Sequence, residues 1–271
     1  MQMLELIAKT GLEFAHDPMY AFVGILGFLL LSKKIYGSAL LLVFFTMIYN
    51  FYLKSLWQMP LPPPMEGWAF PSGHMHCAMV FWGTLACAYR KVWLTAILFF
   101  ILCLVGYGLI YHGYHYPMDI LGSVLFGSLS ITLYHLLGHT PFFKDKPYRF
   151  GIILGILGLG MILLLPPELR KNQLWQGLGG LFGLSLGWST LQAQGSTIRF
   201  NFFQNCLLVV IASCVAALLY WGIGLFPFPE KALIFLQLFA VSFWVASSKL
   251  ILKKIYSNQF ACRRVSSGNN A

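Results

Sequence analysis

The 271-residue chain is 58% hydrophobic and only 10% charged, with a formal net charge of +10. Because a soluble domain carries about 25% charged residues, this composition excludes an ordinary soluble protein and indicates one that is largely surrounded by lipid. Positive net charge is also common in nucleic-acid-binding proteins, and the distribution of the charge along the chain decides between these two classes.

Nine apolar runs along the chain are long enough to cross the roughly 30 Å hydrocarbon core of a bilayer. They cover residues 19–32, 36–56, 72–89, 92–111, 118–138, 150–166, 174–191, 203–226 and 232–252. The preceding segment, residues 1–18, mixes apolar and charged side chains as a short amphipathic helix on the membrane surface does. The pattern predicts an all-α protein, a polytopic membrane helical bundle of about nine transmembrane helices.

Threading the chain through these nine spans separates its charges onto two faces. One face receives 13 of the 18 lysines and arginines, and the other receives seven of the eight acids. By the positive-inside rule the first face is cytoplasmic, so the N-terminus lies outside and a tail at residues 256–271 lies inside. The basic residues therefore indicate membrane topology, and a nucleic-acid partner is not expected.

Two histidines return to the non-cytoplasmic face at the starts of two predicted spans. His74 ends the sequence Phe-Pro-Ser-Gly-His before one span, and His115 precedes another. One descent and one ascent separate them, each about one bilayer thickness at 1.5 Å per residue, so both reach a similar depth. Asp119 follows His115 by one helical turn, where its carboxylate can hold one ring nitrogen and leave the other free to attack.

The segment before His74 adds an anion-binding element. Ser72 and Gly73 begin a helix whose free backbone N–H groups, with the Ser72 hydroxyl, can cradle a phosphate. Two histidines and an aspartate could instead bind a metal, but no further carboxylate or thiol converges on this point. We therefore expect no metal and no organic cofactor here. We expect the site to be catalytic, because an ionisable group at a membrane interface is usually functional.

Three segments resemble the motifs KxxxxxxRP, PSGH and SRxxxxxHxxxD of the type 2 phosphatidic acid phosphatase family, the membrane relatives of the vanadium haloperoxidases. The second motif is complete, the third keeps His115 and Asp119, and the first keeps Lys54. The resemblance covers about residues 40–135. Leu61 and Leu109 stand where the family has two phosphate-clamping arginines.

The resemblance implies phosphoester chemistry at the outer face on a membrane lipid that carries a phosphate, a diphosphate or a phosphodiester headgroup. His115 would attack phosphorus to form a phosphohistidine, Asp119 would hold its tautomer, and His74 would act as acid and base. The residues expected to bind the phosphate are Lys54, Ser72 and Gly73. Leucine cannot replace a bidentate guanidinium, so the sequence favours headgroup transfer more than simple hydrolysis of a phosphate monoester. The alternative is a catalytically degenerate protein that binds or transports a lipid.

The resemblance also suggests a division of the chain. A phosphatase-like core would occupy residues 19–140, and additional transmembrane helices of unknown role would occupy residues 141–255. Glycines at four-residue spacing in these helices permit close helix packing, which we expect within one chain, with a homodimer seam as the alternative. Bacterial relatives carry extra spans of this kind, so we expect an integral protein of the bacterial inner membrane.

Overall fold

Helices form nearly all of the regular structure in the computed structural model, which describes residues 1–193 and 201–268, with side chains as far as residue 250. The helices are α1 (Gln2–Glu13), α2 (Asp17–Leu26), η1 (Gly27–Leu31), α3 (Lys33–Trp57), α4 (Gly73–Tyr89), α5 (Val92–Tyr111), α6 (Pro117–Gly138), α7 (Pro141–Lys144), α8 (Tyr148–Leu164), η2 (Pro167–Leu169), α9 (Asn172–Ala193), α10 (Phe202–Gly224) and α11 (Glu230–Gly268). No strand occurs in these residues. The predicted all-α polytopic membrane bundle is confirmed.

Each of the nine predicted spans falls on one helical segment, but the helices differ in their ability to cross a bilayer. Within the described residues, α3, α5, α6, α10 and the first part of α11 are long and apolar enough. The pair formed by α1 and α2–η1, bent by 54°, counts as a sixth only if its two parts together form one span. Because α4 and α8 have only 17 residues each, the number of nine full spans remains a prediction. α11 continues to Gly268 through most of the predicted tail, whose last residues, 269–271, lie outside the described part.

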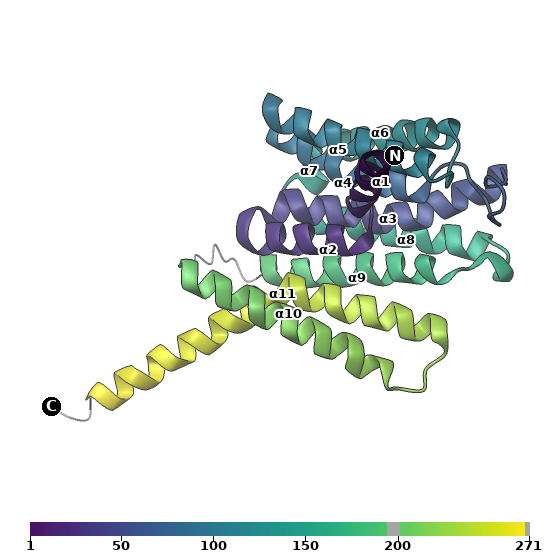
Figure 1. The fold of residues 1–271 in the computed structure, drawn as a ribbon. Coiled ribbons are helices and arrows are strands. Elements are labelled where there is room, and N and C mark those ends of the chain that lie inside the picture. Colours follow the sequence, from purple (N-terminus) through teal and green to yellow (C-terminus); the bar gives the residue numbers. More distant parts are fainter. Residues whose placement is uncertain (194–200, 269–271) are drawn as a thin grey trace.

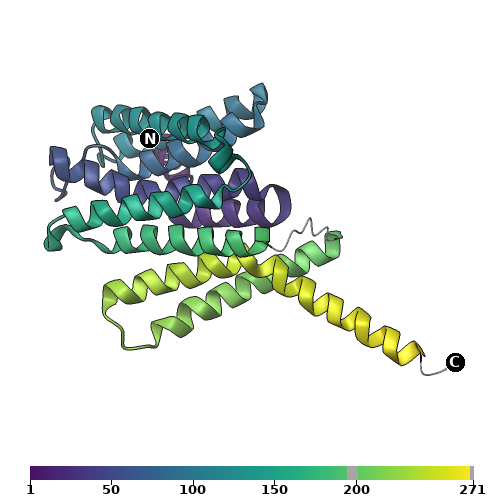
Figure 2. The ribbon, with the colours of Figure 1, turned by 180° about the vertical axis from the view of Figure 1, so that it is seen from behind.

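The connections between helices gather at two ends of the bundle (Figures 1 and 2). The loops after α3, α5, α8 and α10 lie at one end, and those after α4 and α6 lie at the other, as does the C-terminal end of α11. Lys54 is in the last turn of α3, His74 in the first turn of α4, and His115 precedes α6. The three residues predicted to share a membrane face therefore lie at the same end.

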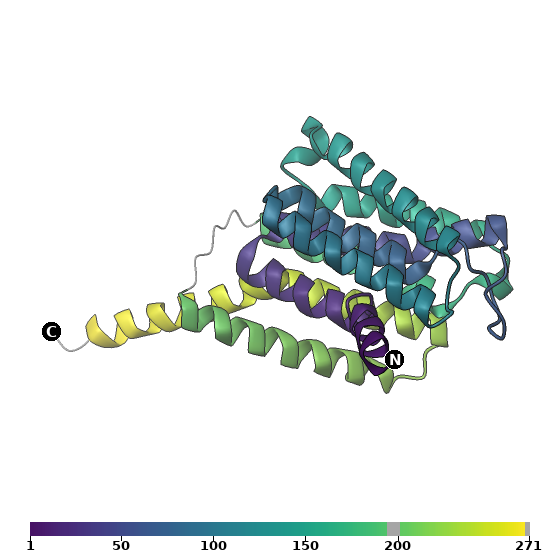
Figure 3. The same cartoon turned by 45° about the horizontal axis from the view of Figure 1, so that its top comes forward.

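The N-terminal helix packs more specifically than a surface segment needs to. In Figures 1 and 3, α1 crosses the bundle, and it packs against α5. A Cβ on Gly108 of α5 would lie 2.6 Å from the Ala8 carbonyl oxygen, so glycine permits this approach. The Trp82 indole then donates a hydrogen bond of 3.0 Å to the Phe14 carbonyl. These contacts bring residues 15–17 to the end of the bundle that carries the histidines.

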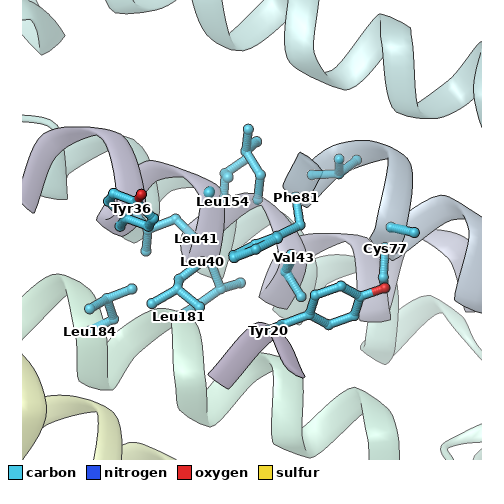
Figure 4. Close-up of a cluster of buried hydrophobic side chains, with 14 of the residues drawn as sticks. Tyr20, Tyr36, Leu40, Leu41, Val43, Cys77, Phe81, Leu154, Leu181 and Leu184 are labelled. Atoms are coloured by element: carbon cyan, nitrogen blue, oxygen red, sulfur yellow. The ribbon is translucent and has the colours of Figure 1, made fainter. Parts of the chain in front are cut away.

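The apolar core is shared between the two halves of the chain. Figure 4 shows side chains from α2, α3, α4, α8 and α9 packed together. Its labelled residues are Tyr20, Tyr36, Leu40, Leu41, Val43, Cys77, Phe81, Leu154, Leu181 and Leu184. Since burial of apolar area and close packing hold such a cluster together, α8 and α9 support the first half directly and do not form a separate unit.

Close packing of α9 on α11 depends on the glycines at four-residue spacing. A Cβ on Gly179, Gly183 or Gly187 would meet the backbone carbonyl oxygens of Phe235, Phe239 and Phe243, respectively, at less than van der Waals distance. These glycines are therefore used for packing within the chain, as small residues in membrane helices commonly are.

Gly183→Ala is expected to destabilise the protein by about 1–3 kcal/mol, because the added methyl group forces α9 and α11 apart. Gly160→Ala in α8 is the matched control, since a Cβ there would have no heavy atom within 4 Å. Its higher helix propensity should leave stability unchanged or raised by up to about 1 kcal/mol. Thermal unfolding in detergent compares the two variants, and equal midpoints would contradict the packing.

Candidate active site

Two segments 40 residues apart in sequence are joined by hydrogen bonds at the starts of α4 and α6. The Ser72 amide donates to the Asp119 carbonyl at 3.2 Å. The buried Ser123 hydroxyl lies 2.8 Å from the Ser72 carbonyl and 2.7 Å from the Asp119 carbonyl. Next to it, Gly122 leaves room for the Phe70 ring. The Pro-Ser-Gly-His segment and the His115–Asp119 segment are thereby held as one rigid unit.

The His115 side chain is oriented by a carboxylate. Its Nδ1 lies 3.1 Å from Oδ2 of Asp119, and the two side chains are only 7% and 4% exposed. The same oxygen accepts a 2.8 Å hydrogen bond from the Tyr116 amide, which fixes the carboxylate. Since the carboxylate accepts, Nδ1 carries the proton, and Nε2 is left with a lone pair. Nε2 has no hydrogen-bond partner among the described residues.

His74 is the more exposed of the two histidines. Its ring lies 6.0 Å from the ring of His16, at the turn between α1 and α2, and the two rings meet edge to face. The neighbouring Ser72 is fully buried, and its hydroxyl caps α4 by accepting from the Met75 amide at 3.5 Å. An accessible imidazole can exchange protons with water, as an acid–base group must.

These residues surround a cavity of about 680 Å³. Of the predicted site residues, Lys54, Gly73, His74 and His115 line it, whereas Ser72 and Asp119 lie behind the lining. The other lining residues are Ala15, Asp17, Met47, Asn50, Phe51, Leu61, Glu66, Gly67, Trp68, Cys77, Leu169, Lys171 and Gln173. The cavity is therefore closed partly by the N-terminal turn and by the loop between α8 and α9.

The loop between α3 and α4 is tied to the wall of the cavity by two side chains of α3. Lys54 Nζ donates a 2.6 Å hydrogen bond to the Trp68 carbonyl. One turn earlier, Asn50 donates to the Pro71 carbonyl at 3.2 Å, and its amide nitrogen lies 3.1 Å from Nδ1 of His76. These contacts hold the Pro-Ser-Gly-His segment against α3 and leave the Lys54 ammonium at the cavity.

The two leucines at the positions where the resemblance leads us to expect arginines occupy different surroundings. Leu61 lines the cavity, where an arginine would add a positive charge. Leu109 is 1% exposed and belongs to the apolar core. Its carbonyl, by contrast, accepts hydrogen bonds from the amides of Tyr114 and His115 and so supports the histidine loop.

Burial and the nearby Lys54 ammonium lower the pKa of His115 from 6.5 to about 4, against the opposite effect of the Asp119 carboxylate. The imidazole is therefore neutral near neutral pH, as a nucleophile must be. His115 lies in the loop between α5 and α6, outside the helices that could span the membrane.

Lys54→Gln is expected to move the acid limb of the pH profile of kcat/KM to higher pH. Loss of a cation that lowers the pKa of His115 raises that pKa, so the neutral nucleophile disappears at a higher pH. The profiles of wild type and variant on one substrate give the comparison, because ionisation of the substrate is common to both. Lys231→Gln, a lysine that does not line the cavity, should leave the limb in place; an unmoved limb in Lys54→Gln would contradict the assignment.

Residues 34–142 match the family model of the PAP2 superfamily. The match covers less than half of the chain, and it supports membership in the PAP2 superfamily. The PAP2 match runs from α3 to the start of α7 and contains Lys54, His74, His115 and Asp119, so it supports a phosphatase-type protein. No curated protein and no solved structure gives a significant match to the chain.

Several site residues were not predicted from the sequence. Asn50 precedes Lys54 by four residues and Ser123 follows Asp119 by four, so helical spacing could have indicated both. Asp17 and Lys171 lie outside the PAP2 match and carry no local motif. Only the packing of α2 and α9 against the PAP2 helices brings them to the cavity.

Proposed function

We propose that this protein is an integral membrane phosphoesterase that hydrolyses or transfers the phosphate-bearing headgroup of a lipid through a phosphohistidine. The observation that carries the proposal is the opening of Lys54, His74 and His115 into one cavity, with Asp119 hydrogen-bonded to the far nitrogen of His115. A positioned nucleophile, an oriented base and a cation are the parts that phosphoryl transfer requires. By the distribution of basic residues, this end of the bundle would face away from the cytoplasm.

The arrangement supports a two-step reaction. Nε2 of His115 attacks phosphorus, a P–N bond forms, and the bond from phosphorus to the leaving oxygen breaks, while His74 gives that oxygen a proton. His74, now neutral, takes a proton from water or from an acceptor hydroxyl, whose oxygen attacks the phosphohistidine and releases His115. Asp119 holds the Nδ1 proton throughout, and Lys54 stabilises the charge on the phosphoryl oxygens.

An apolar groove beside the cavity supports a lipid as the substrate. This groove, of about 240 Å³, lies between α2, α3, α9 and α11. It shares Asp17 and Met47 with the cavity, and most of its other lining residues are aliphatic or aromatic. A cavity with charged side chains that lies next to an apolar groove complements a molecule with a charged headgroup and a hydrocarbon chain.

The second candidate is a lipid-binding or transport protein with an inactive site. The observation in its favour is Leu61, which gives the cavity an apolar side chain where the resemblance leads us to expect a guanidinium. Loss of one preorganised donor costs about 10²–10³-fold in rate. The two candidates make opposite predictions for chemistry, since only the enzyme forms a phosphohistidine.

The deciding experiment is phosphate release by the purified protein in detergent. The substrates are a lipid phosphate monoester, a polyprenyl diphosphate and a phosphodiester lipid, with and without an acceptor lipid, and each is run beside His115→Ala. Release or transfer that disappears in the variant supports the enzyme and identifies the phosphate type. If the folded wild type acts on none of them, the proposal of an enzyme is wrong, and a lipid-binding or transport role is favoured.

A further inference from the structure

Two lysines from distant parts of the chain line the cavity. Lys54 comes from α3 inside the PAP2 match, and Lys171 comes from the loop between α8 and α9, outside it. The Lys54 ammonium donates to the Trp68 carbonyl. The Lys171 ammonium has neither a hydrogen bond nor an ion pair in the part of the chain that the structure describes. Lys171 is therefore a cation on the cavity wall that no other interaction uses.

The backbone around Lys171 is held in place on both sides. Arg170 donates from Nε to the Leu165 carbonyl at 3.0 Å and from Nη2 to the Leu163 carbonyl at 3.1 Å, which closes the end of α8. The Lys171 amide donates to the Leu169 carbonyl at 2.9 Å. Asn172, the first residue of α9, donates to Glu230 at 2.6 Å and ties the loop to α11. The position of Lys171 at the cavity is thus a consequence of packing and not of a free loop.

Lys171 comes directly before α9, a helix that lines both the cavity and the apolar groove. α9 contributes Gln173 to the cavity and, one turn later, Gln176 to the groove. The pKa of His115 is lowered by Lys54, and Lys171 is not among the groups that shift it. Lys54 therefore lies near the nucleophile, and Lys171 lies at the start of the helix that continues to the groove.

We propose that Lys171 binds the phosphate next to the hydrocarbon chain of a lipid diphosphate while His115 attacks the terminal phosphate. This assignment rests on the proposed function. With the chain in the groove, the inner phosphate lies between the groove and the terminal phosphate, on the wall of the cavity that Lys171 and Gln173 line. When the bond from the terminal phosphorus to the bridging oxygen breaks, that oxygen stays on the lipid phosphate and takes the proton of His74, and the Lys171 ammonium pairs with the negative charge that remains on this phosphate. A lipid monophosphate has no second phosphate for Lys171 to contact.

The test compares two substrates with the same hydrocarbon chain, a polyprenyl diphosphate and a polyprenyl monophosphate. Lys171→Ala should lower kcat/KM for the diphosphate about 10–10²-fold and for the monophosphate less than about threefold. Lys171→Arg should retain most of the activity. Lys231→Ala is the matched control. It also removes one lysine, which follows Glu230, the residue that Asn172 contacts, but Lys231 does not line the cavity. This variant should leave kcat/KM for both substrates unchanged. An equal fall on both substrates, or no fall on either, overturns the role of Lys171.

A binding measurement separates failure of this inference from failure of the proposed function. A non-hydrolysable methylene-bridged analogue of the polyprenyl diphosphate is titrated into the purified protein in detergent. Lys171→Ala should weaken its binding about tenfold or more, whereas Lys231→Ala should not. If the wild type releases no phosphate from any substrate but binds the analogue more tightly than Lys171→Ala does, the proposal of an enzyme is wrong and Lys171 still binds the inner phosphate. If wild type and Lys171→Ala bind the analogue equally, the Lys171 site is wrong, whatever the activity.

Discussion

Replacing His115 with alanine is expected to lower phosphate release by about 10⁴-fold or more, because the variant has lost the atom that forms the covalent bond to phosphorus. Phosphate release from the best substrate of the panel, measured at saturating concentration, gives the loss in kcat. In the wild type, brief mixing with substrate labelled in the transferred phosphate should leave acid-labile label on the protein. The label should be absent from His115→Ala.

The control for this variant lies in the same loop. His112 is half-buried and does not line the cavity, so His112→Ala should retain activity within about threefold and should still take up label. Thermal unfolding of both variants in detergent checks that the fold is kept. Label on folded His115→Ala would contradict His115 as the nucleophile, and equal losses in the two variants would point to disruption of the loop.

The predicted site residues were accessible from the sequence because their placement depends on local geometry. The rise of a helix sets the depth to which His74 and His115 return, and one helical turn separates His115 from Asp119. Both relationships hold in the structure, where the starts of α4 and α6 lie at one end of the bundle and the His115–Asp119 distance is 3.1 Å. Their chemical roles remain predictions until they are measured.

The rest of the site depends on contacts between elements that are far apart in the sequence. Ser72 was expected at the phosphate, but its hydroxyl is needed to cap α4 and lies behind the cavity lining. No motif in the sequence marks His16 as part of the site, yet the packing of α1 across α5 brings its ring to His74. Lys171 enters the cavity because α9 packs against α3. No periodicity or motif within a single segment carries this information, since it depends on how the helices pack.

Leu61 and Leu109, at the two positions where the resemblance leads us to expect arginines, show why the residue type at a motif position does not by itself determine its effect. Position 61 faces the cavity, so leucine there removes charge from the site. Position 109 is buried in the core, where leucine contributes apolar packing while its backbone still supports the His115 loop. Compensation for the first replacement would have to come from Lys54, the lysine of the cavity that lies near His115. The second needs no such compensation to keep the fold.

His74→Ala is expected to lower phosphate release from a lipid substrate by about 10²–10⁴-fold, because His74 protonates the leaving oxygen and later activates water. The loss should depend on the leaving group. An aryl phosphate with an acidic phenol needs no proton donor, so the first step should survive in the variant while attack of water on the phosphohistidine stays slow. His74→Ala should then release about one phenol per protein molecule in a fast phase, followed by slow turnover, and should carry more trapped label than the wild type.

His16→Ala supplies the comparison, because it removes the ring that contacts His74 and leaves His74 itself. We expect it to lower activity by less than about tenfold and to produce neither the burst nor the extra label, since the acid–base group remains. Rapid-mixing measurements of phenol release for the three proteins, with label trapped at the same times, distinguish these outcomes. If His74→Ala slows the lipid and the aryl substrate equally and traps no label, then His74 does not act in both steps. Its position in the cavity would then point to a role in binding the phosphate beside Lys54.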